Sequence, residues 1–376
     1  MRVALAHKRL DLNGGTERDL YRTAEGLRDL GHEVHLFCSE FSVASPSGTC
    51  GHRLPVLPMG RTARLVSLAF LGPRTISRFE CDVVVSFGRM VQQDVLRCGG
   101  GSHRGFMQRM GKLGGMRRRL WQNVSAYHRT LLAIERREFS PGHFKKIIAV
   151  SAEVKRDLME NYAIPAERIA VLYNGVDAER FNPSKRQISG LRVRNEFGIP
   201  HDAPLVLFVG SGFKRKGLDR LLAIWGSPQL KDAYLLVAGE DARLQRYKAW
   251  AESVGKERIF FAGLREDVES FYAAADVVAL PSVQEAFGNV VLEALASGVP
   301  VLVSAAAGAA EVLSGALADG VVARCDDSIE LTAKLAQLLA RSRDPQFRCE
   351  ARRLGERFSW PRHFQKLDAL LKEVAS

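Results

Sequence analysis

The sequence has no long hydrophobic run and few cysteines, and both absences narrow its class. No stretch approaches the roughly 18 consecutive apolar residues that a membrane-spanning helix requires. The apolar core of the N-terminal segment Met1–Arg9 is too short for a secretory signal peptide. The six cysteines are scattered, with no Cys-x-x-Cys pair, at positions 38, 50, 81, 98, 325 and 349. The sequence therefore predicts a cytoplasmic protein with reduced thiols.

Ligand patterns for a catalytic metal are also missing. No Asp-x-Asp pair lies in a suitable loop, and the histidines and cysteines show no zinc-binding spacing. We therefore expect no metal and no other bound cofactor.

The composition is that of a globular protein with a strong excess of basic residues. The chain has 376 residues, of which 46% are hydrophobic and 26% charged, a size that suits two domains. Its formal net charge is +12. Such a charge indicates an acidic partner: a nucleic acid, an anionic membrane surface or a phosphorylated substrate.

Short apolar strands alternate with amphipathic helices along the whole chain, the pattern of doubly wound parallel sheets. The expected strands of the first half are 3–6, 34–38, 82–86, 94–98, 147–150 and 168–172. The expected strands of the second half are 205–209, 234–238, 259–262, 277–280, 299–303 and 321–323. We expect two Rossmann-like α/β domains.

Two acids, Glu285 and Glu293, lie on either side of a predicted helix start. An apolar strand ends at Pro281, and the helix then opens at Gly288, so that Glu293 is expected on its third turn. The free N–H groups of the first turn, at Gly288, Asn289 and Val290, are typical of an anion site. These residues would suit a sugar nucleotide, with amides for the diphosphate and carboxylates for hydroxyl groups. The alternative is an ordinary amphipathic helix with a solvated glutamate at each end.

A second glycine-rich stretch follows the strand 205–209. Gly210-Ser211-Gly212 is followed by three basic residues, of which Arg215 and Lys216 precede Gly217. Basic side chains at the carboxyl end of such a strand would neutralise the charge that develops on a departing nucleoside diphosphate. The alternative is a solvated basic turn.

The residues Glu285-Ala-Phe-Gly-Asn-Val-Val-Leu-Glu293, with Ser297-Gly298 and Pro300-Val301 behind them, resemble the E-x7-E signature of glycosyltransferase family 4. Arg215-Lys216-Gly217 is similar to the basic element that holds the donor diphosphate in that family. The resemblance implies the GT-B fold, in which two Rossmann-like domains face a central cleft. It also implies transfer of a sugar with retained anomeric configuration and without a metal.

The same resemblance divides the chain. Asn174-Gly-Val-Asp177 is similar to the family's interdomain hinge. An acceptor domain is expected at 1–173, completed by the C-terminal helix 359–376, and a donor domain at 174–358.

The resemblance also assigns roles to single residues. Catalytic roles are implied for Asp19, His103, Arg215, Lys216 and Glu285. Donor contacts are implied for Gly14, Gly15, Gly212, Arg215, Lys216, Leu264, Arg265, Glu285, Phe287, Gly288, Asn289, Val290 and Glu293. Glu285 would hold the sugar, Glu293 the ribose, and the backbone near Leu264 the base. Two alternatives stay open: Asp19 in the first helical turn, paired with Thr16 as a cap, and a purely structural His103.

The segment 101–134 contains seven basic residues and no acid, with apolar side chains at helical spacing. A basic amphipathic segment with aromatic residues is typical of a membrane-surface element. We expect the basic residues of 104–129 to contact an anionic membrane, although the segment could instead pack on its own domain. No RNA-binding motif is present, so no nucleic-acid partner is expected.

Within family 4 the chain is most similar to enzymes that transfer glucose from UDP-glucose to the lipopolysaccharide core. A peripheral enzyme on the cytoplasmic face of the inner membrane would follow, with a lipopolysaccharide core or glycolipid acceptor. The glycine-rich segment Asp94–His103 departs from that pattern and leaves the acceptor open. Other family 4 donors, such as UDP-GlcNAc or GDP-mannose, a same-fold sugar-nucleotide epimerase and a basic RNA-binding protein are the alternatives.

Overall fold

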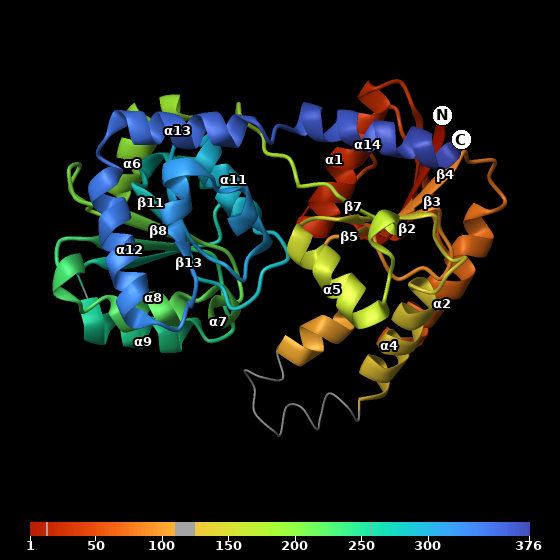
Figure 1. Cartoon of the computed structure of the whole chain (residues 1–376), viewed down its shortest axis with the longest axis horizontal. Helices are drawn as coiled ribbons and strands as arrows, with labels where there is room; N and C mark the ends of the chain where they lie inside the picture. The colour runs from red at the N-terminus through yellow and green to blue at the C-terminus, as the bar shows by residue number, and fades with distance from the viewer. Residues whose placement is uncertain (13, 110–124, 256) are drawn as a thin grey trace. The chain divides into compact units, whose positions relative to one another are not determined.

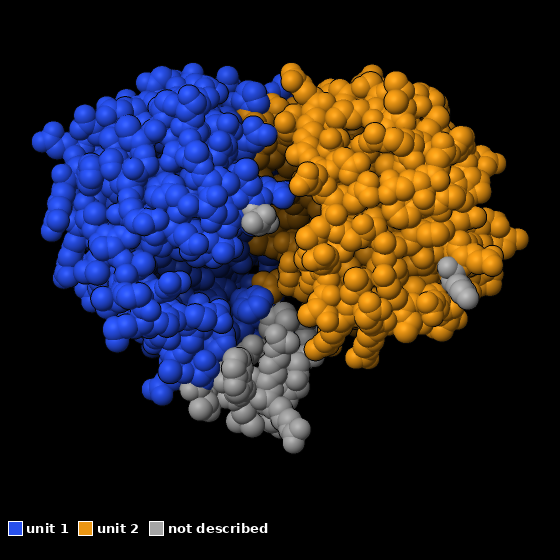
Figure 2. Space-filling view, turned by 180° about the vertical axis from the view of Figure 1, so that it is seen from behind, with its two compact units in different colours: residues 1–173, 361–376 blue, residues 174–360 orange. Residues whose placement is uncertain are grey.

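A computed structural model describes residues 1–12, 14–109, 125–255 and 257–376, which form two compact units. Unit 1 consists of Met1–Tyr173 and Pro361–Ser376, and unit 2 of Asn174–Trp360. The two units are coloured separately in Figure 2. Among the described helices, none is both long and apolar enough to cross a bilayer.

Unit 1 is built on a seven-stranded parallel sheet in the order β3-β2-β1-β4-β5-β6-β7. Its strands are β1 (Arg2–Leu10), β2 (Glu33–Phe41), β3 (Cys50–Arg53), β4 (Val83–Ser86), β5 (Val95–Cys98), β6 (Lys146–Ala149) and β7 (Ile169–Val171). Its α-helices include α1 (Gly15–Asp29), α2 (Gly60–Ile76), α4 (Ala126–Glu138), α5 (Ala152–Tyr162) and α14 (Trp360–Ala375), and η1 (Ala166–Arg168) is a 3₁₀ turn. A further helical segment covers 103–109.

The C-terminal helix α14 belongs to the core of unit 1. Leu367 and Leu371 pack among the buried side chains of α1 and the central strands, and α14 lies alongside α1 in Figure 1. A Cβ atom on Gly26 of α1 would lie 2.1 Å from the Phe364 ring, so only glycine permits this approach. Each fully buried leucine contributes about 1.5–3 kcal/mol to the stability of the unit.

Unit 2 repeats the design with a six-stranded parallel sheet in the order β10-β9-β8-β11-β12-β13. Its strands are β8 (Leu205–Val209), β9 (Tyr234–Ala238), β10 (Ile259–Gly263), β11 (Val277–Leu280), β12 (Val301–Ser304) and β13 (Val321–Val322). Its α-helices are α6 (Ser189–Glu196), α7 (Phe213–Lys216), α8 (Leu218–Ile224), α9 (Leu244–Gly255), α10 (Val268–Ala274), α11 (Asn289–Ala296), α12 (Ser328–Arg341) and α13 (Pro345–Glu356). The 3₁₀ turns are η2 (Pro183–Gln187), η3 (Pro228–Leu230), η4 (Gly308–Val312) and η5 (Gly315–Gly320).

The predicted fold class of two doubly wound parallel sheets is confirmed, because every strand pair in both sheets is parallel. Ser151 is the N-cap of α5, since its side chain accepts a hydrogen bond from Val154 N at 3.1 Å. Two details differ from the prediction. Strand β3 was not predicted, and α7 makes the basic turn a short helix. Residues 110–124 of the basic segment 104–129 lie outside the described residues.

Strand order locates where each sheet can bind a ligand. In unit 1, β1 lies between β2 and β4; in unit 2, β8 lies between β9 and β11. In unit 1 the chain adds β2 and β3 on one side of β1 and then continues with β4 on the other side. In unit 2 the same change of side falls between β8 and β11. Open parallel sheets bind ligands beyond the carboxyl ends of the strands at such a switch point. In unit 2 this edge carries the loops that begin at Gly210 and Pro281, which contain the predicted diphosphate and sugar residues.

Candidate active site

The basic turn after β8 contains three glycines with positive φ, a backbone conformation that other residues seldom adopt. Gly210, Gly212 and Gly217 have φ values of 128°, 77° and 89°. A Cβ atom on Gly217 would lie 2.0 Å from the Pro281 carbonyl oxygen, so the turn packs directly on the loop after β11. Phe213 is fully buried beneath the turn. This packing presents Arg215 and Lys216 to the same edge as Glu285.

Arg215, Lys216 and Glu285 form one charged cluster. The Arg215 Nη1 atom donates to Glu285 Oε2 at 2.6 Å and to the Gln284 carbonyl oxygen at 3.1 Å. The Lys216 Nζ atom lies 3.9 Å from the same carboxylate oxygen. The side chains of Lys216 and Glu285 are only 14% and 18% exposed. Two cations thus converge on one acid beside the start of α11.

The positive charge of Lys216 is only partly neutralised within this cluster. Burial lowers the pKa of its ammonium group, and although Glu285 raises it, the balance remains downward, with Arg215 adding to the decrease. Its side chain lies across Gly210, where a Cβ atom would meet Nζ at 2.5 Å. A further anion at this point would stabilise the charged form of the lysine.

Glu285 is fixed by its backbone as well as by its side chain. Its N–H donates to the Ala306 carbonyl oxygen at 3.3 Å, and its carbonyl oxygen accepts from Gly308 N at 3.0 Å. The loop after β12 therefore holds the acid in place. Gly288, with a φ of 101°, then turns the chain into α11.

Glu293 is the fifth residue of α11 and therefore lies on its second turn, not on the third as predicted. Its Oε2 atom accepts a hydrogen bond from the buried Tyr272 hydroxyl at 2.5 Å. Burial and this carboxylate together raise the pKa of the Tyr272 phenol well above its usual value. Tyr272 therefore orients Glu293, a contact that sequence spacing does not reveal.

The remaining residues that were predicted to contact the donor differ in their burial and in their hydrogen-bond partners. Asn289 accepts from the Asn174 side chain at 2.7 Å, which links the helix start to the hinge segment. Phe287 and Val290 are buried. Leu264 is 65% exposed after β10. The Arg265 side chain is bound to Glu196 at 2.8 Å and Asp267 at 3.0 Å, so its backbone remains the expected contact for a base.

Asp19 in unit 1 has a different role from a helix cap. It is the fifth residue of α1, on the second turn rather than the first, and the N-cap Gly14 makes no side-chain capping bond. Its buried carboxylate instead accepts a hydrogen bond from Nε of Arg97 on β5. The alternative pairing with Thr16 is therefore wrong, because Oδ2 of Asp19 is bonded to an arginine 78 residues away.

Gly14 and Gly15 open α1 beyond the carboxyl end of β1. The space beside Gly14 is filled by Glu17, whose Oε2 atom would lie 1.9 Å from a Cβ at this position, whereas the space beside Gly15 is open within 4 Å. Glu17 is buried next to His7, Lys8 and Arg9, at 3.7, 3.5 and 3.4 Å. Glu17 was not predicted from the sequence, although an acid in the first turn of a helix is a common signal.

Glu17 should make stability depend on pH. The nearby His7 imidazole, with its nitrogen 3.7 Å from the carboxylate, is the main cause that lowers the Glu17 pKa to about 2 from 4.5. A lowered carboxyl pKa stabilises the fold above pH 4.5, and this contribution is lost as the pH falls toward 2. Glu17→Gln should therefore reduce the free energy of unfolding by up to about 3 kcal/mol at pH 7. Urea unfolding should show this difference shrinking between pH 4.5 and 3; a constant difference would contradict the assignment.

His103 opens the helical segment 103–109 beyond the carboxyl end of β5. Its N–H donates to the buried Glu135 of α4 at 2.7 Å, and its Nε2 atom lies 2.9 Å from His128 Nδ1. Burial is the main cause that lowers the His103 pKa to about 4, and nearby Arg89 adds to it. The imidazole is therefore neutral at pH 7.

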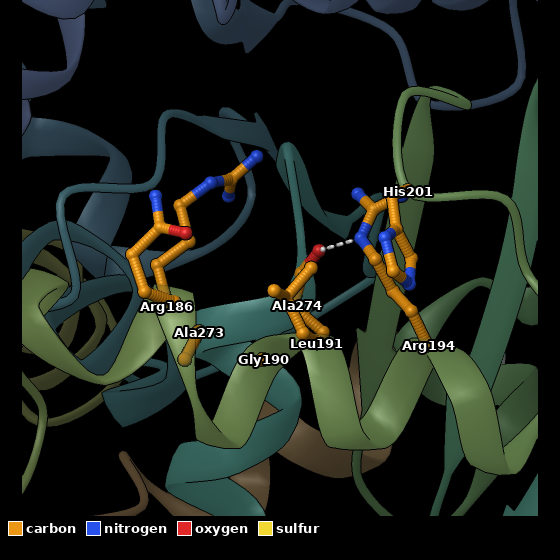
Figure 3. Close-up of a pocket in the computed structure, with 8 residues that line it drawn as sticks. Arg186, Gly190, Leu191, Arg194, His201, Ala273 and Ala274 are labelled. Carbon is orange, nitrogen blue, oxygen red and sulfur yellow. Dashed lines mark hydrogen bonds between the residues drawn. The ribbon is translucent and has the colours of Figure 1, made fainter.

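A separate pocket of about 180 Å³ lies near the amino end of β11, away from this edge (Figure 3). Arg186 and Arg194 line it. Both are already engaged: Arg186 bonds the Ala275 carbonyl oxygen at 2.8 Å, and Arg194 bonds the Ala274 carbonyl oxygen at 3.0 Å. Both also bond Asp276, at 2.5 and 2.8 Å. The side chains of both arginines are therefore already engaged in holding the C-terminal end of α10.

Comparison with known proteins agrees with this arrangement. The family described as Glycosyltransferase Family 4 matches residues 13–180, and Glycosyl transferases group 1 matches residues 191–354. The lipopolysaccharide glucosyltransferase WaaG of Escherichia coli is 28% identical over 344 residues, covering 88% of this chain and 87% of that protein.

Solved structures give the same result. A crystal structure of WaaG, a glycosyltransferase involved in lipopolysaccharide biosynthesis, has a TM-score of 0.79 at 26% identity and covers 98% of this chain and 99% of its own. Anabaena HepE, solved in complex with UDP-glucose, shares the fold with a TM-score of 0.71 at 17% identity, covering 99% and 100%. Together the two family matches span most of the chain. The chain therefore belongs to glycosyltransferase family 4 and is a glycosyltransferase of the GT-B fold.

Proposed function

We propose that this glycosyltransferase moves glucose from UDP-glucose to a lipopolysaccharide core or a similar membrane-associated glycan, with retention of anomeric configuration. The observation that carries the proposal is the cluster of Arg215, Lys216 and Glu285 at the carboxyl ends of β8 and β11. The similarity to the Escherichia coli enzyme supports the donor and the acceptor. The UDP-glucose complex of Anabaena HepE, which has the same fold, supports a nucleotide-sugar donor.

The basic pair would act on the leaving group. When the bond between the sugar C1 and the diphosphate oxygen breaks, negative charge grows on the diphosphate. Arg215 can donate two parallel hydrogen bonds to phosphate, and Lys216 supplies a point charge. Because this charge increases along the reaction, fixed cations stabilise the transition state more than the ground state.

Binding of the donor would exchange partners within the cluster. Glu285 accepts a hydrogen bond from Arg215 at 2.6 Å. A diphosphate would take over that guanidinium, and the released carboxylate could then accept hydrogen bonds from sugar hydroxyls. Glu293, held by Tyr272 at 2.5 Å, would accept from the ribose. The backbone near Leu264 would lie against the base.

No divalent ion is needed in this scheme. Arg215, Lys216 and the first N–H groups of α11 provide the positive charge that a metal would otherwise supply. We therefore propose that transfer proceeds in the presence of a chelator.

On the acceptor side, Asp19 and His103 would line the entrance for the attacking hydroxyl. The acceptor oxygen forms the new bond to C1 as the diphosphate leaves from the same face, and the hydroxyl proton passes to a phosphate oxygen of the donor. Neutral His103 would contribute hydrogen bonding and not charge. The Asp19–Arg97 pair would keep the Asp19 carboxylate in place.

The basic segment 104–129 would bring the enzyme to the cytoplasmic face of an anionic membrane, where a lipid-linked acceptor is found. Among its described residues, Arg104 and Arg109 are held by unit 1, with Arg109 paired to Asp157 at 3.1 Å. Membrane contact would therefore depend on the other basic residues of the segment. Each would contribute about 1 kcal/mol near an anionic leaflet.

A transfer assay tests the proposal. UDP release should require both UDP-glucose and a heptose-containing acceptor, should continue in EDTA, and should yield the α-configured product that retention from UDP-α-glucose requires. A thermal-shift panel with UDP-, GDP- and ADP-sugars separates the candidate donors. Turnover of donor without acceptor to an isomeric sugar nucleotide would instead identify an epimerase, and would overturn the proposal.

A further inference from the structure

The start of the helical segment 103–109 is tied to a buried acid on another helix. Glu135 of α4 is fully buried, and its carboxylate accepts hydrogen bonds from His103 N at 2.7 Å and Arg104 N at 3.1 Å. It also accepts from Arg89 Nη1 at 2.8 Å and from the Tyr162 hydroxyl. Four donors from three separate parts of unit 1 thus converge on one carboxylate.

Arg89 adds a strained element to the same cluster. It lies in the loop after β4 with a φ of 71°, a backbone conformation that arginine seldom adopts. Its N–H donates to Glu138 Oε1 at 2.7 Å, and its side chain reaches Glu135. Strain of this kind persists only where the surroundings hold it, and such places cluster at functional sites. Glu135 therefore joins the loops after β4 and β5, two neighbouring strands at the ligand-binding edge.

The His103 side chain has its own partner on α4. Its ring stacks on His128 with centroids 5.1 Å apart and an angle of 15° between the planes. The Nε2 atom of His103 lies 2.9 Å from Nδ1 of His128, so one ring donates to the other. A neutral imidazole donates from one nitrogen and accepts at the other. This bond therefore selects the tautomer of His103 and the role of its Nδ1 atom toward a substrate.

We propose that His128 and Glu135 are positioning residues for His103: Glu135 fixes the backbone at the start of the helix, and His128 fixes the orientation and tautomer of the ring. The proposal rests on the proposed function, in which His103 meets substrate. Neither residue needs to touch substrate itself. Both lie on one face of α4, one at its third residue and one at its tenth, so α4 acts as the support for the loop after β5.

A double-mutant cycle separates positioning from general stability. His128→Ala should lower kcat for sugar transfer about tenfold, with little change in KM for the donor, since one orienting hydrogen bond is lost. In a His103→Ala background the same change should have no further effect, because there is no ring left to orient. His128→Asn, whose amide can replace the Nδ1 atom, should recover part of the rate.

A second histidine pair in unit 1 provides the matched control. His52 stacks on His35 with centroids 5.1 Å apart and bonds it at 2.9 Å, close to the geometry of the pair at His103. His52→Ala should leave kcat unchanged. Equal losses of rate in the two alanine variants, or an additive loss in the double variant, would show that His128 acts only through stability and would overturn the proposal.

A spectroscopic measurement on the free protein does not depend on turnover. The ¹⁵N chemical shifts of the His103 ring should report one tautomer in the wild type and a mixture in His128→Ala. Glu135→Gln should keep the fold but broaden the backbone signals of His103 and Arg104; if that variant does not fold, the His128 variants still test the ring. An unchanged tautomer in His128→Ala overturns the proposal. If the wild type transfers no sugar while the ring responds as expected, the proposed function fails alone.

Discussion

Replacing Lys216 with alanine is expected to lower kcat for sugar transfer by about 10²–10³-fold, the loss typical of removing one preorganised group that stabilises developing charge. The lysine is nearly buried and only partly compensated by Glu285, as the lowered pKa of its ammonium group shows. A bound diphosphate would supply the missing anion, so the variant should also bind UDP more weakly. Steady-state kinetics and calorimetric titration with UDP would measure the two effects.

Lys214 provides the control for this prediction. It lies two residues earlier on the same short helix α7, and it is exposed. Lys214→Ala removes the same charge from the same turn without changing the cluster with Glu285, and should retain wild-type kcat and UDP affinity. If the two alanine variants lose activity equally, the net charge of the turn and not the position of Lys216 matters, and the assignment fails.

Glu285→Gln should separate transfer from nucleotide binding. The amide keeps the size of the side chain but loses the charge that strengthens hydrogen bonds from sugar hydroxyls, so kcat should fall about 100-fold. UDP itself lacks the hexose that is transferred. Because Glu285 competes for Arg215 at 2.6 Å and repels a diphosphate, its neutralisation should leave UDP affinity unchanged or raise it. Lys216→Ala should therefore lower UDP affinity, whereas Glu285→Gln should not.

Glu240→Gln is the matched control, since Glu240 is an exposed acid just after β9 at the same edge of the sheet. It should retain full activity. A Glu285→Gln variant that loses UDP affinity in step with its rate would show that the acid supports the nucleotide rather than the sugar, and its proposed role would have to be abandoned.

The local pattern of apolar runs and glycines was sufficient to predict the two parallel sheets. Strands such as Leu205–Val209 are continuous apolar runs because parallel strands are buried on both faces, and the glycine breaks that follow them locate the ligand-binding edge. Strand β3 was missed because Cys50-Gly-His-Arg53 has neither an apolar run nor an alternating pattern. It is an edge strand that is defined by its pairing with β2 and not by a sequence pattern of its own.

The candidate site could be predicted only in part. Glycine and charge spacing brought Arg215, Lys216 and Glu285 into consideration, and the structure joins them in one cluster. The contacts that orient other site residues run between distant segments: Asp19 with Arg97 and Tyr272 with Glu293. No local periodicity encodes such pairs, because they depend on which strands become neighbours in the sheet.

The position of Glu17 over Gly14 escaped prediction for a related reason. Gly14 and Gly15 were both expected to contact the donor, but the side chain of Glu17, three residues after Gly14, folds back over that glycine. Only Gly15 therefore keeps open space. A glycine in the sequence marks a position without a side chain of its own. The sequence does not show which neighbouring side chain fills the space beside it.

In the proposed function, fixed positive charge after β8 holds the diphosphate. The dissociation constants of UDP and uridine, measured in the presence of EDTA, test this role. UDP should bind the wild type about 100-fold more tightly than uridine, since two charge-assisted interactions separate them. This ratio should approach one in the double variant with Arg215→Ala and Lys216→Ala. An unchanged ratio in that variant, or UDP binding that disappears on chelation, would show that the two cations do not hold the diphosphate.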